Sequence, residues 1–360
     1  MEKKKTILIH SNFCKAFTGF GKNSKNILKY LYKTGKYNIV EAANMKKVGD
    51  PALKKLPWKC FGTIPNNVES LPEQSKRAAG YGVLEIDNII QEVRPDIYLG
   101  VEDIWAFTDF NKKPWWGKVT PMIWTTLDSL PILPQAVEFA PKLEHYYVWS
   151  SFAEKAFKKL GYDNVKTLRG SLDTKTFNKL KEEDRSRLRT QNSISNDNFI
   201  IGFVFRNQLR KSVPNLLDGF KLFKEEHKEA KLLLHTNWSE GWDITSLIEE
   251  KGILNDDILT TYYCPSCRGY EVKPFAQGKQ RCKHCNGQES ETTSVSKGVS
   301  ETQLNEIYNL MDVYCHPFTS GGQEIPVQEA KLAELITLVT DYSCGEDSCS
   351  EESGGLPLSW

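Results

Sequence analysis

The chain of 360 residues carries 47 Lys and Arg against 46 Asp and Glu, a formal net charge of +1 with neutral histidines. This balance argues against a protein that binds nucleic acid through a broadly basic surface. With 39% hydrophobic and 26% charged residues, the composition is that of an ordinary globular protein and excludes a disordered or membrane-embedded chain. At about 100–200 residues per domain, the length favours two domains.

Apolar runs give no sign of export or of a membrane span. Residues 7–9 are apolar, but His10 follows at once, so the run is too short for a signal peptide. The longest apolar run, residues 199–205, is far below the ~18 residues that a membrane helix needs. We therefore expect a cytoplasmic protein. Nine cysteines, an odd number, then argue against a disulfide framework and direct attention to metal ligation.

Short β-rich runs alternate with helical patterns along the first half, which is typical of βαβ units and a parallel sheet. The expected strands cover residues 6–9, 96–100, 121–125, 146–149 and 165–168. We expect three helices. The first begins at residue 26 and ends at Gly35, and the other two cover 84–93 and 151–160. A loop over residues 11–21 separates the first strand from the first helix.

A charged and polar stretch, residues 179–198, separates the two halves of the chain. We expect an interdomain linker there, and a surface helix with a turn is the alternative. The second half repeats the α/β rhythm, with strands over 199–205, 231–235, 258–263 and 313–315 and helices over 215–226, 244–251, 301–311 and 326–335. These patterns predict domains 1–178 and 199–360 that face a cleft, where parallel sheets bind ligands at the carboxyl ends of their strands.

Two Cys-x-x-Cys pairs give the most specific signal in the sequence. Cys264-Pro265-Ser266-Cys267 and Cys282-Lys283-His284-Cys285 are separated by residues 268–281, a spacing that suits a tetrahedral site with four thiolate ligands. Because four thiolates leave no open coordination position, we expect structural Zn²⁺. A redox dithiol and an iron–sulfur centre with the same ligands are the alternatives.

The two Cys pairs interrupt the second α/β series between a strand and a helix. We therefore expect residues 263–297 to form a zinc-ribbon insertion on the second domain. Its basic residues are Arg268, Lys273, Lys279, Arg281 and Lys283. A few charges on a solvated loop are ordinarily only hydrated, so we do not expect a nucleic-acid partner.

The turn after the expected strand 165–168 has the pattern of a known family. Gly170 permits a tight turn, Asp173 can cap it and Phe177 can pack against it. This Gly-x-x-Asp-x-x-x-Phe segment resembles the one that closes the N-terminal domain of family-four glycosyltransferases of the GT-B fold. The resemblance covers residues 7–341 and implies two Rossmann-like doubly wound domains facing a cleft, with the zinc ribbon as an addition.

Two cations follow the first strand of the second half. Arg206 and Lys211 lie on a loop at the carboxyl end of that strand, where paired cations can cradle a diphosphate. The equivalent Arg and Lys of the family bind the nucleotide-sugar diphosphate and offset charge on the leaving group. The resemblance therefore implies this catalytic role for both residues. Phe205 and Ser212 stand where the family has flanking glycines, and Arg210 is an additional cation.

Residues 320–330 resemble the loop and helix start of the family's donor site. Gly321 and Gly322 leave the backbone open to a ligand, and the amides at the start of the helix can receive phosphate or sugar oxygens. Glu329 matches the second Glu of the family's two-glutamate motif, which binds the donor ribose. The position of the first Glu is Gly321, so we expect Glu324 or the loop amides to contact the transferred sugar.

The first half has its own candidate ligand positions. Gly19 and Gly21 resemble the family's glycine loop between the first strand and the first helix, which lies at the cleft. Glu102 and Asp103 follow the strand at 96–100 and Asp128 follows the strand at 121–125, where an acidic residue can orient or deprotonate an acceptor hydroxyl. A helix cap or turn residue is the alternative for each of the three.

The resemblance implies a retaining glycosyltransferase of the hexosyltransferase type that needs no catalytic metal. Its donor is a nucleoside-diphosphate sugar, and its acceptor is unknown: a glycan, protein, lipid or modified nucleobase. A non-catalytic scaffold that uses the zinc ribbon as contact surface is the main alternative, and another nucleotide-sugar enzyme such as an epimerase is the next. Because the family's last helices have no counterpart after residue 341, we expect a partial chain with an incomplete second domain.

Overall fold

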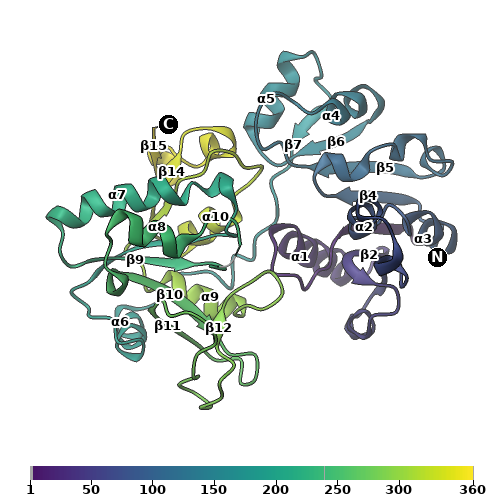
Figure 1. Cartoon of the computed structure of the whole chain (residues 1–360). Coiled ribbons are helices and arrows are strands. Elements are labelled where there is room, and N and C mark those ends of the chain that lie inside the picture. Colours follow the sequence, from purple (N-terminus) through teal and green to yellow (C-terminus); the bar gives the residue numbers. More distant parts are fainter. Residues whose placement is uncertain (1–2, 239, 360) are drawn as a thin grey trace. The chain divides into compact units, whose positions relative to one another are not determined.

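The computed structural model describes residues 3–238 and 240–359, so residues 1, 2, 239 and 360, including the outer ends of the two expected domains, lie outside the described residues. The chain divides into two compact units (Figure 1). The first contains the described residues up to Leu172 and also Gly321–Gln323, and the second contains Asp173–Ser320 and the residues from Glu324 onward. Within the described part, no helix is both long and apolar enough to cross a membrane.

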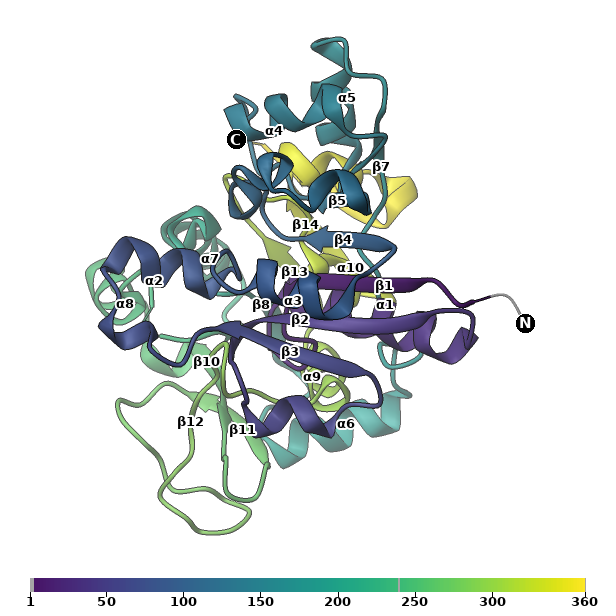
Figure 2. The same ribbon diagram turned by 90° about the vertical axis from the view of Figure 1, so that its right-hand side faces the viewer.

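The first unit is built on a parallel sheet with the order β3-β2-β1-β4-β5-β6-β7. Its strands are β1 Thr6–Asn12, β2 Asn38–Lys47, β3 Lys59–Ile64, β4 Ile97–Val101, β5 Thr120–Thr125, β6 His145–Val148 and β7 Val165–Thr167. Its helices are α1 Gly19–Thr34, α2 Glu73–Gly80, α3 Ile86–Val93, α4 Pro134–Phe139 and α5 Ser151–Lys159. Figure 2 shows β4, β1, β2 and β3 side by side. The strand order reverses between β1 and β4.

The second unit has a sheet with the order β11-β10-β9-β8-β13-β14-β15, in which β11 and the short β12 pair antiparallel with β10. Its strands are β8 Phe199–Val204, β9 Ala230–His235, β10 Ile258–Tyr263, β11 Tyr270–Pro274, β12 Glu291–Thr292, β13 Val313–His316, β14 Ile336–Thr340 and β15 Gly355–Leu358. Its helices are α6 Glu182–Gln191, α7 Val213–Glu226, α8 Ile244–Lys251, α9 Glu301–Tyr308 and α10 Ile325–Leu332. The predicted α/β class, with two Rossmann-like sheets, is confirmed.

The first helix begins earlier than the sequence pattern predicts. The side chain of Thr18 accepts a hydrogen bond from the amide of Gly21, so Gly19 and Gly21 lie in the first turn of α1 and not in a preceding loop. A Cβ on Gly21 would lie 2.6 Å from the carbonyl oxygen of Ala16, so only glycine fits this turn. The predicted end at Gly35, which adopts φ 62°, is confirmed.

Six strands of the described residues are not predicted by the hydrophobic pattern: β2, β3, β11, β12, β14 and β15. In β2, the buried positions include polar Glu41 and Asn44 and the weak strand formers Ala42 and Ala43, which hide the apolar run. The strand β3 pairs with β2. Near the other end of the chain, β15 continues the second sheet in parallel with β14.

The charged stretch at 179–198 contains the helix α6, which packs on the second unit through buried ion pairs. Arg189, whose side chain is only 3% exposed, contacts Asp312 at 2.7 Å, and Arg185 pairs with the same carboxylate. Main-chain carbonyls also accept hydrogen bonds from Arg185 and Arg189, among them that of Asn309 at 3.0 Å. These contacts fix α6 beside the amino end of β13, because Asp312 directly precedes that strand.

Candidate functional site

A cluster of charged side chains lies at the carboxyl ends of two neighbouring strands of the second sheet. Arg210 and Lys211 lie in the turn that follows β8, and His316 is the last residue of β13. Glu324 lies directly before α10, at the end of the loop that follows β13. The strand order of this sheet reverses between β8 and β13, and open α/β sheets bind their ligands at such a point.

Glu324 is the centre of this cluster. Its Oε1 lies 2.5 Å from Lys211 Nζ and 3.0 Å from Arg210 Nη1. Its Oε2 lies 3.1 Å from His316 Nε2, which is an ion-pair distance without the alignment of a hydrogen bond. The side chains of Lys211 and Glu324 are 4% and 10% exposed. Lys211 and Glu324 are therefore nearly closed to water, whereas the side chain of Arg210, 32% exposed, lies at the edge of the cluster.

Neighbouring groups hold the imidazole of His316 in place. Its Nδ1 lies 2.9 Å from the hydroxyl of Tyr314, which in turn donates a hydrogen bond to the carbonyl of Val204 at 3.0 Å. The ring also packs edge-on against Phe203. Lys211 Nζ lies 5.8 Å from the ring centre of Phe318. The cluster is thus supported on its inner side by buried aromatic residues of β8 and β13 and the loop that follows.

Burial and charge act in opposite directions on the groups of this cluster. Burial lowers the pKa of His316 to about 4, although Glu324 opposes the shift, so the imidazole is neutral at pH 7. Burial alone would raise the pKa of Glu324, but Lys211, His316 and Arg210 hold it well below its ordinary value. The pKa of Lys211 is lowered by burial and by the charge of Arg210 against the attraction of Glu324. Glu324 is therefore an anion that offsets one of two adjacent cations.

The structure brings Lys211 and Glu324 together and places Arg206 elsewhere. Arg206 forms an ion pair of 2.5 Å with Glu240, and its side chain is half exposed. Arg210 stands beside Lys211 instead. The sequence signal for Arg210 is only its position as an additional cation next to Lys211.

Glu329 lies on the first turns of α10 and is fully buried. Its Oε2 accepts a hydrogen bond of 2.9 Å from the hydroxyl of Tyr308 on α9. Burial raises the pKa of Tyr308 well above its ordinary value, and the charge of Glu329 adds to the shift. The sequence does not reveal the contact between Tyr308 and Glu329, because the two residues come from different helices.

The glycines before α10 lie on the loop that follows β13. Gly321 and Gly322 belong to the short segment that groups with the first unit, and both are buried. An added Cβ on Gly322 would lie 2.1 Å from the side chain of Thr126, so the backbone there leaves no room for a larger residue.

The four predicted metal ligands come together. The Sγ atoms of Cys264, Cys267, Cys282 and Cys285 all lie within 4.8 Å of one another. We call each Cys-x-x-Cys turn a knuckle. The Sγ atoms of Cys264 and Cys285 are 3.7 Å apart and those of Cys267 and Cys282 are 3.6 Å apart, so each of these distances joins the two knuckles. A tetrahedral Zn²⁺ with Zn–S bonds of about 2.3 Å requires edges of about 3.8 Å. The donor set and its dimensions therefore fit structural Zn²⁺.

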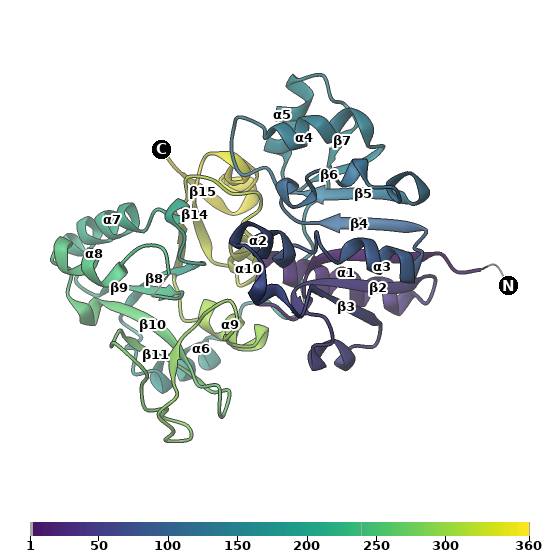
Figure 3. The same cartoon turned by 45° about the vertical axis from the view of Figure 1, so that its right-hand side comes forward.

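The two knuckles have the same backbone design. Arg268 and Asn286, each four positions after the first Cys of its pair, adopt a left-handed φ of 60°. The amides of Gly269 and His284 lie 3.4 Å from the Sγ of Cys267 and Cys282, an arrangement that stabilises thiolates. Figure 3 shows this segment as loops that extend from the β10–β11 end of the second sheet.

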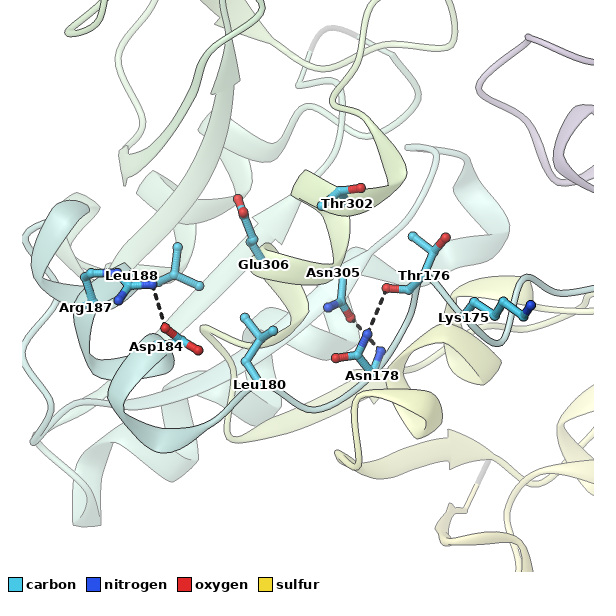
Figure 4. Close-up of a pocket in the computed structure, with 10 residues that line it drawn as sticks. All are labelled: Lys175, Thr176, Asn178, Leu180, Asp184, Arg187, Leu188, Thr302, Asn305 and Glu306. Carbon is cyan, nitrogen blue, oxygen red and sulfur yellow. Dashed lines mark hydrogen bonds and ion pairs between the residues drawn. The ribbon is translucent and has the colours of Figure 1, made fainter.

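A separate polar cavity of about 460 Å³ lies in the second unit between residues 175–188 and α9 (Figure 4). Three of its charged groups are engaged: Arg187 pairs with Asp184 at 2.6 Å, and Glu306 accepts a hydrogen bond from Tyr270. Asn305 accepts the amide of Asn178 at 3.0 Å. The cavity contains none of the predicted donor-site residues.

The first unit has a buried polar cluster in which Glu102 joins His10, Tyr98 and Asn44, three residues that the sequence patterns do not single out. His10 on β1 lies 2.7 Å from the hydroxyl of Tyr98 and 2.9 Å from Asn44 Oδ1, and Asn44 Nδ2 donates to Glu102 at 3.1 Å. Burial, and then the charge of Asp103, raises the pKa of Glu102 to about 8. Burial lowers the pKa of His10 to about 4. These residues lie toward the carboxyl ends of β1, β2 and β4.

Asp128 lies in the same unit, after β5, in a partly exposed loop. The hydroxyl of Thr126, two residues before Asp128, donates a hydrogen bond of 2.6 Å to Asp103. Acidic side chains that follow β4 and β5 thus lie at the same edge of the first sheet, as expected for neighbouring parallel strands.

Comparison with known proteins identifies the fold. No protein-family model matches the sequence, and no curated protein matches it significantly. The structure is similar to sucrose-phosphate synthase from Thermosynechococcus elongatus, with a TM-score of 0.66, 13% identity and coverage of 99% of this chain and 86% of that chain. Anabaena HepE in complex with UDP and glucose is similar with a TM-score of 0.66 and 11% identity, over 99% of this chain and 86% of that chain. WaaG, a glycosyltransferase involved in lipopolysaccharide biosynthesis, is similar with a TM-score of 0.61 and 12% identity, over 98% of this chain and 86% of that chain. These similarities establish the GT-B fold.

Proposed function

We propose that this protein with the GT-B fold is a glycosyltransferase that moves a sugar from a nucleoside-diphosphate donor to an acceptor. The observation that carries the proposal is the cluster of Arg210, Lys211 and Glu324 at the point where the strand order of the second sheet reverses. The similar structures supply the donor class, because Anabaena HepE is described in complex with UDP-glucose.

The diphosphate is assigned to the cations that follow β8. Lys211 and Arg210 remain next to Glu324, and Arg206, half exposed, is the third cation of the same loop. Fixed cations in a site with little water stabilise the charge that develops on a departing diphosphate. We therefore assign to Lys211 and Arg210, with Arg206 as the third cation, the task that other folds give to a divalent metal ion.

The sugar and ribose are assigned to the residues before and within α10. Glu324 takes the transferred sugar, helped by the loop amides at Gly321 and Gly322, and buried Glu329 takes the ribose. Gly19 and Gly21, at the start of α1, allow close approach of substrate to the first unit, and retention of configuration is the expected outcome. Because Glu324 is already paired with two cations, its carboxylate is fixed in orientation before any substrate arrives.

The remaining assignments concern the acceptor and the metal. Asp128, after β5, orients an acceptor hydroxyl, and the acceptor is a glycan, protein, lipid or modified nucleobase. Zn²⁺ held by the four cysteines supplies structure and no chemistry to the transfer. The protein is proposed to act in the cytoplasm.

Calorimetric titration with UDP, GDP, ADP and their glucose conjugates tests the donor site. Lys211→Met is expected to weaken binding of the preferred nucleotide at least 10-fold, because a charge-assisted contact to the diphosphate is lost. Lys251→Met is the matched control, since Lys251 also forms a 2.5 Å ion pair but at the far end of α8. Equal affinities for wild type and a folded Lys211→Met protein would refute the donor site.

A non-catalytic scaffold is the second candidate. It is favoured by the carboxylate of Glu324, which occupies the two cations next to it, and by Gly321 at the place of a glutamate. Chromatographic detection of free sugar or glycosylated product separates the two candidates. A scaffold binds the nucleotide sugar without any turnover, whereas a transferase hydrolyses it slowly even without its acceptor.

A further inference from the structure

The zinc-ribbon insertion, residues 263–297, holds the helix α9 through two side-chain hydrogen bonds. Gln303 Nε2 donates to the carbonyl of Arg268 at 2.9 Å, and the hydroxyl of Tyr270 donates to Glu306 at 2.8 Å. Arg268 directly follows the first knuckle, and its amide bonds back to the carbonyl of Cys264 at 2.8 Å. The position of this carbonyl is thus set by the fold of the knuckle.

The second knuckle supports the same residues. His284 Nε2 lies 2.8 Å from the carbonyl of Tyr270, so both Cys pairs converge on the start of β11. A Cβ on Gly269 would lie 2.6 Å from the ring of His284, which shows how closely the two knuckles pack. Because this packing requires the four thiolates to meet, the partners of α9 depend on the metal ligands.

The other end of α9 reaches the proposed donor site. The hydroxyl of Tyr308 donates to Glu329 at 2.9 Å and lies 3.2 Å from the carbonyl of Pro326, and both side chains of the pair are fully buried. A helix of eight residues is too short to be stable by itself, so its contacts set its position. The contacts described above lie at its third, sixth and eighth residues.

We infer that the metal-loaded ribbon positions Glu329 for nucleotide binding, through α9. Gln303, Tyr270 and Tyr308 are positioning residues in this relay, which runs from the knuckles to α9 and from α9 to α10. The inference rests on the proposed function only in taking Glu329 as a nucleotide ligand. It predicts that nucleotide affinity depends on a metal that lies outside the donor site.

Two conservative variants interrupt the relay without removing a metal ligand. Gln303→Glu keeps the acceptor that receives the amide of Ser300 in the capping box but loses the donor to Arg268. Tyr270→Phe loses only the hydroxyl that bonds Glu306. Tyr262→Phe is the matched control, because the hydroxyl of Tyr262 bonds Ala276 within the same insertion and not α9.

The readouts are the dissociation constant for UDP, hydrogen exchange of the amides at 327–330 in α10, and bound zinc. Gln303→Glu and Tyr270→Phe are expected to raise the dissociation constant about 3-fold to 10-fold, the effect of one lost hydrogen bond, and to speed exchange in α10. Tyr262→Phe keeps both at wild-type values. Chelation of zinc produces the same two changes as the variants, and added Zn²⁺ reverses them.

The outcomes distinguish failure of the relay from failure of the proposed glycosyltransferase function. Wild-type affinity and wild-type exchange in both variants, with zinc retained, overturn the relay. Faster exchange in α10 with unchanged UDP affinity also overturns it, because α9 would then not position a nucleotide ligand. If wild type binds neither UDP nor any other nucleotide of the panel, the proposed function fails, whereas the exchange data still report on the link between ribbon and α10.

Discussion

The two sheets of this molecule carry polar clusters at equivalent places but of opposite electrical character. In the first unit, His10, Asn44 and Glu102 form a chain of hydrogen bonds in which the carboxyl group has a pKa raised to about 8. In the second unit, Glu324 has a pKa held well below its ordinary value by Lys211 and other neighbours. One cluster keeps a proton on a carboxyl group at pH 7, and the other keeps a carboxylate ionised.

The difference shows how one topology prepares two kinds of site. Both sheets are parallel around a reversal of strand order, so both present loops at a comparable edge. Only the second places two cations there, and cations at such an edge suit a diphosphate. A buried protonated carboxyl group suits the donation of a hydrogen bond to a neutral, hydroxylated ligand.

Removing a cation from the second cluster is expected to have the largest effect. Lys211→Met leaves Glu324 nearly buried with one cation fewer, and breaking a buried ion pair costs about 3–5 kcal/mol. We expect the free energy of unfolding of the second unit to fall by an amount in this range. Urea denaturation followed by tryptophan fluorescence measures it.

The double variant Lys211→Met with Glu324→Gln is the control for this prediction. It removes both charges of the pair, so no uncompensated charge is buried and part of the lost stability is expected to return. A double variant that is no more stable than Lys211→Met would show that Glu324 is not the partner that makes the loss costly.

The first cluster is expected to respond to pH in the opposite sense. Because the folded protein keeps a proton on Glu102 that the unfolded chain releases, the contribution of Glu102 to stability falls as pH rises from about 4.5 to about 8. Glu102→Gln mimics the protonated group and removes this loss. The advantage of the variant over wild type is expected to grow by about 3 kcal/mol between pH 5 and pH 8.

Urea denaturation of both proteins at several pH values measures this difference. His10, whose lowered pKa makes stability rise between about pH 4 and pH 6.5, is present in both proteins and cancels in the comparison. Glu73→Gln, a substitution at a side chain that is 90% exposed, is the control. A constant difference between Glu102→Gln and wild type across this range would mean that Glu102 is ionised in the folded protein.

The fold was predictable wherever the apolar pattern is regular. The helix at 244–251 and the strand at 258–263 are confirmed at their predicted bounds, because each is bordered by turn residues and has an unbroken pattern. The strand β2 was not predictable, since tertiary contacts bury polar Glu41: it accepts hydrogen bonds from the amide of Cys14 and from Trp58. No local pattern reports such partners.

The sites divide in the same way. The zinc ligands are visible in the sequence because their spacing is local, and the structure brings all four together. Glu102 is a candidate from its place after a strand, but its link to His10 is not visible in the sequence, because it runs through Asn44 on another strand. Arg206 and Lys211 were paired from a resemblance in spacing, whereas the placement of Arg210 beside Lys211 depends on the turn that follows β8.

The smallest effect is expected from Arg206, and it decides how many cations the donor site has. Its ion pair with Glu240 is half exposed, so Arg206→Ala is expected to change the free energy of unfolding by less than about 0.5 kcal/mol. If Arg206 turns from Glu240 to a diphosphate, Arg206→Ala weakens UDP binding less than Lys211→Met does, and Glu240→Gln strengthens it because it frees the guanidinium. Calorimetry at two salt concentrations measures both, since a lost exposed charge also reduces the salt dependence of binding. Unchanged affinity and salt dependence in both variants would restrict the diphosphate to Lys211 and Arg210, which are the cations that Glu324 already holds.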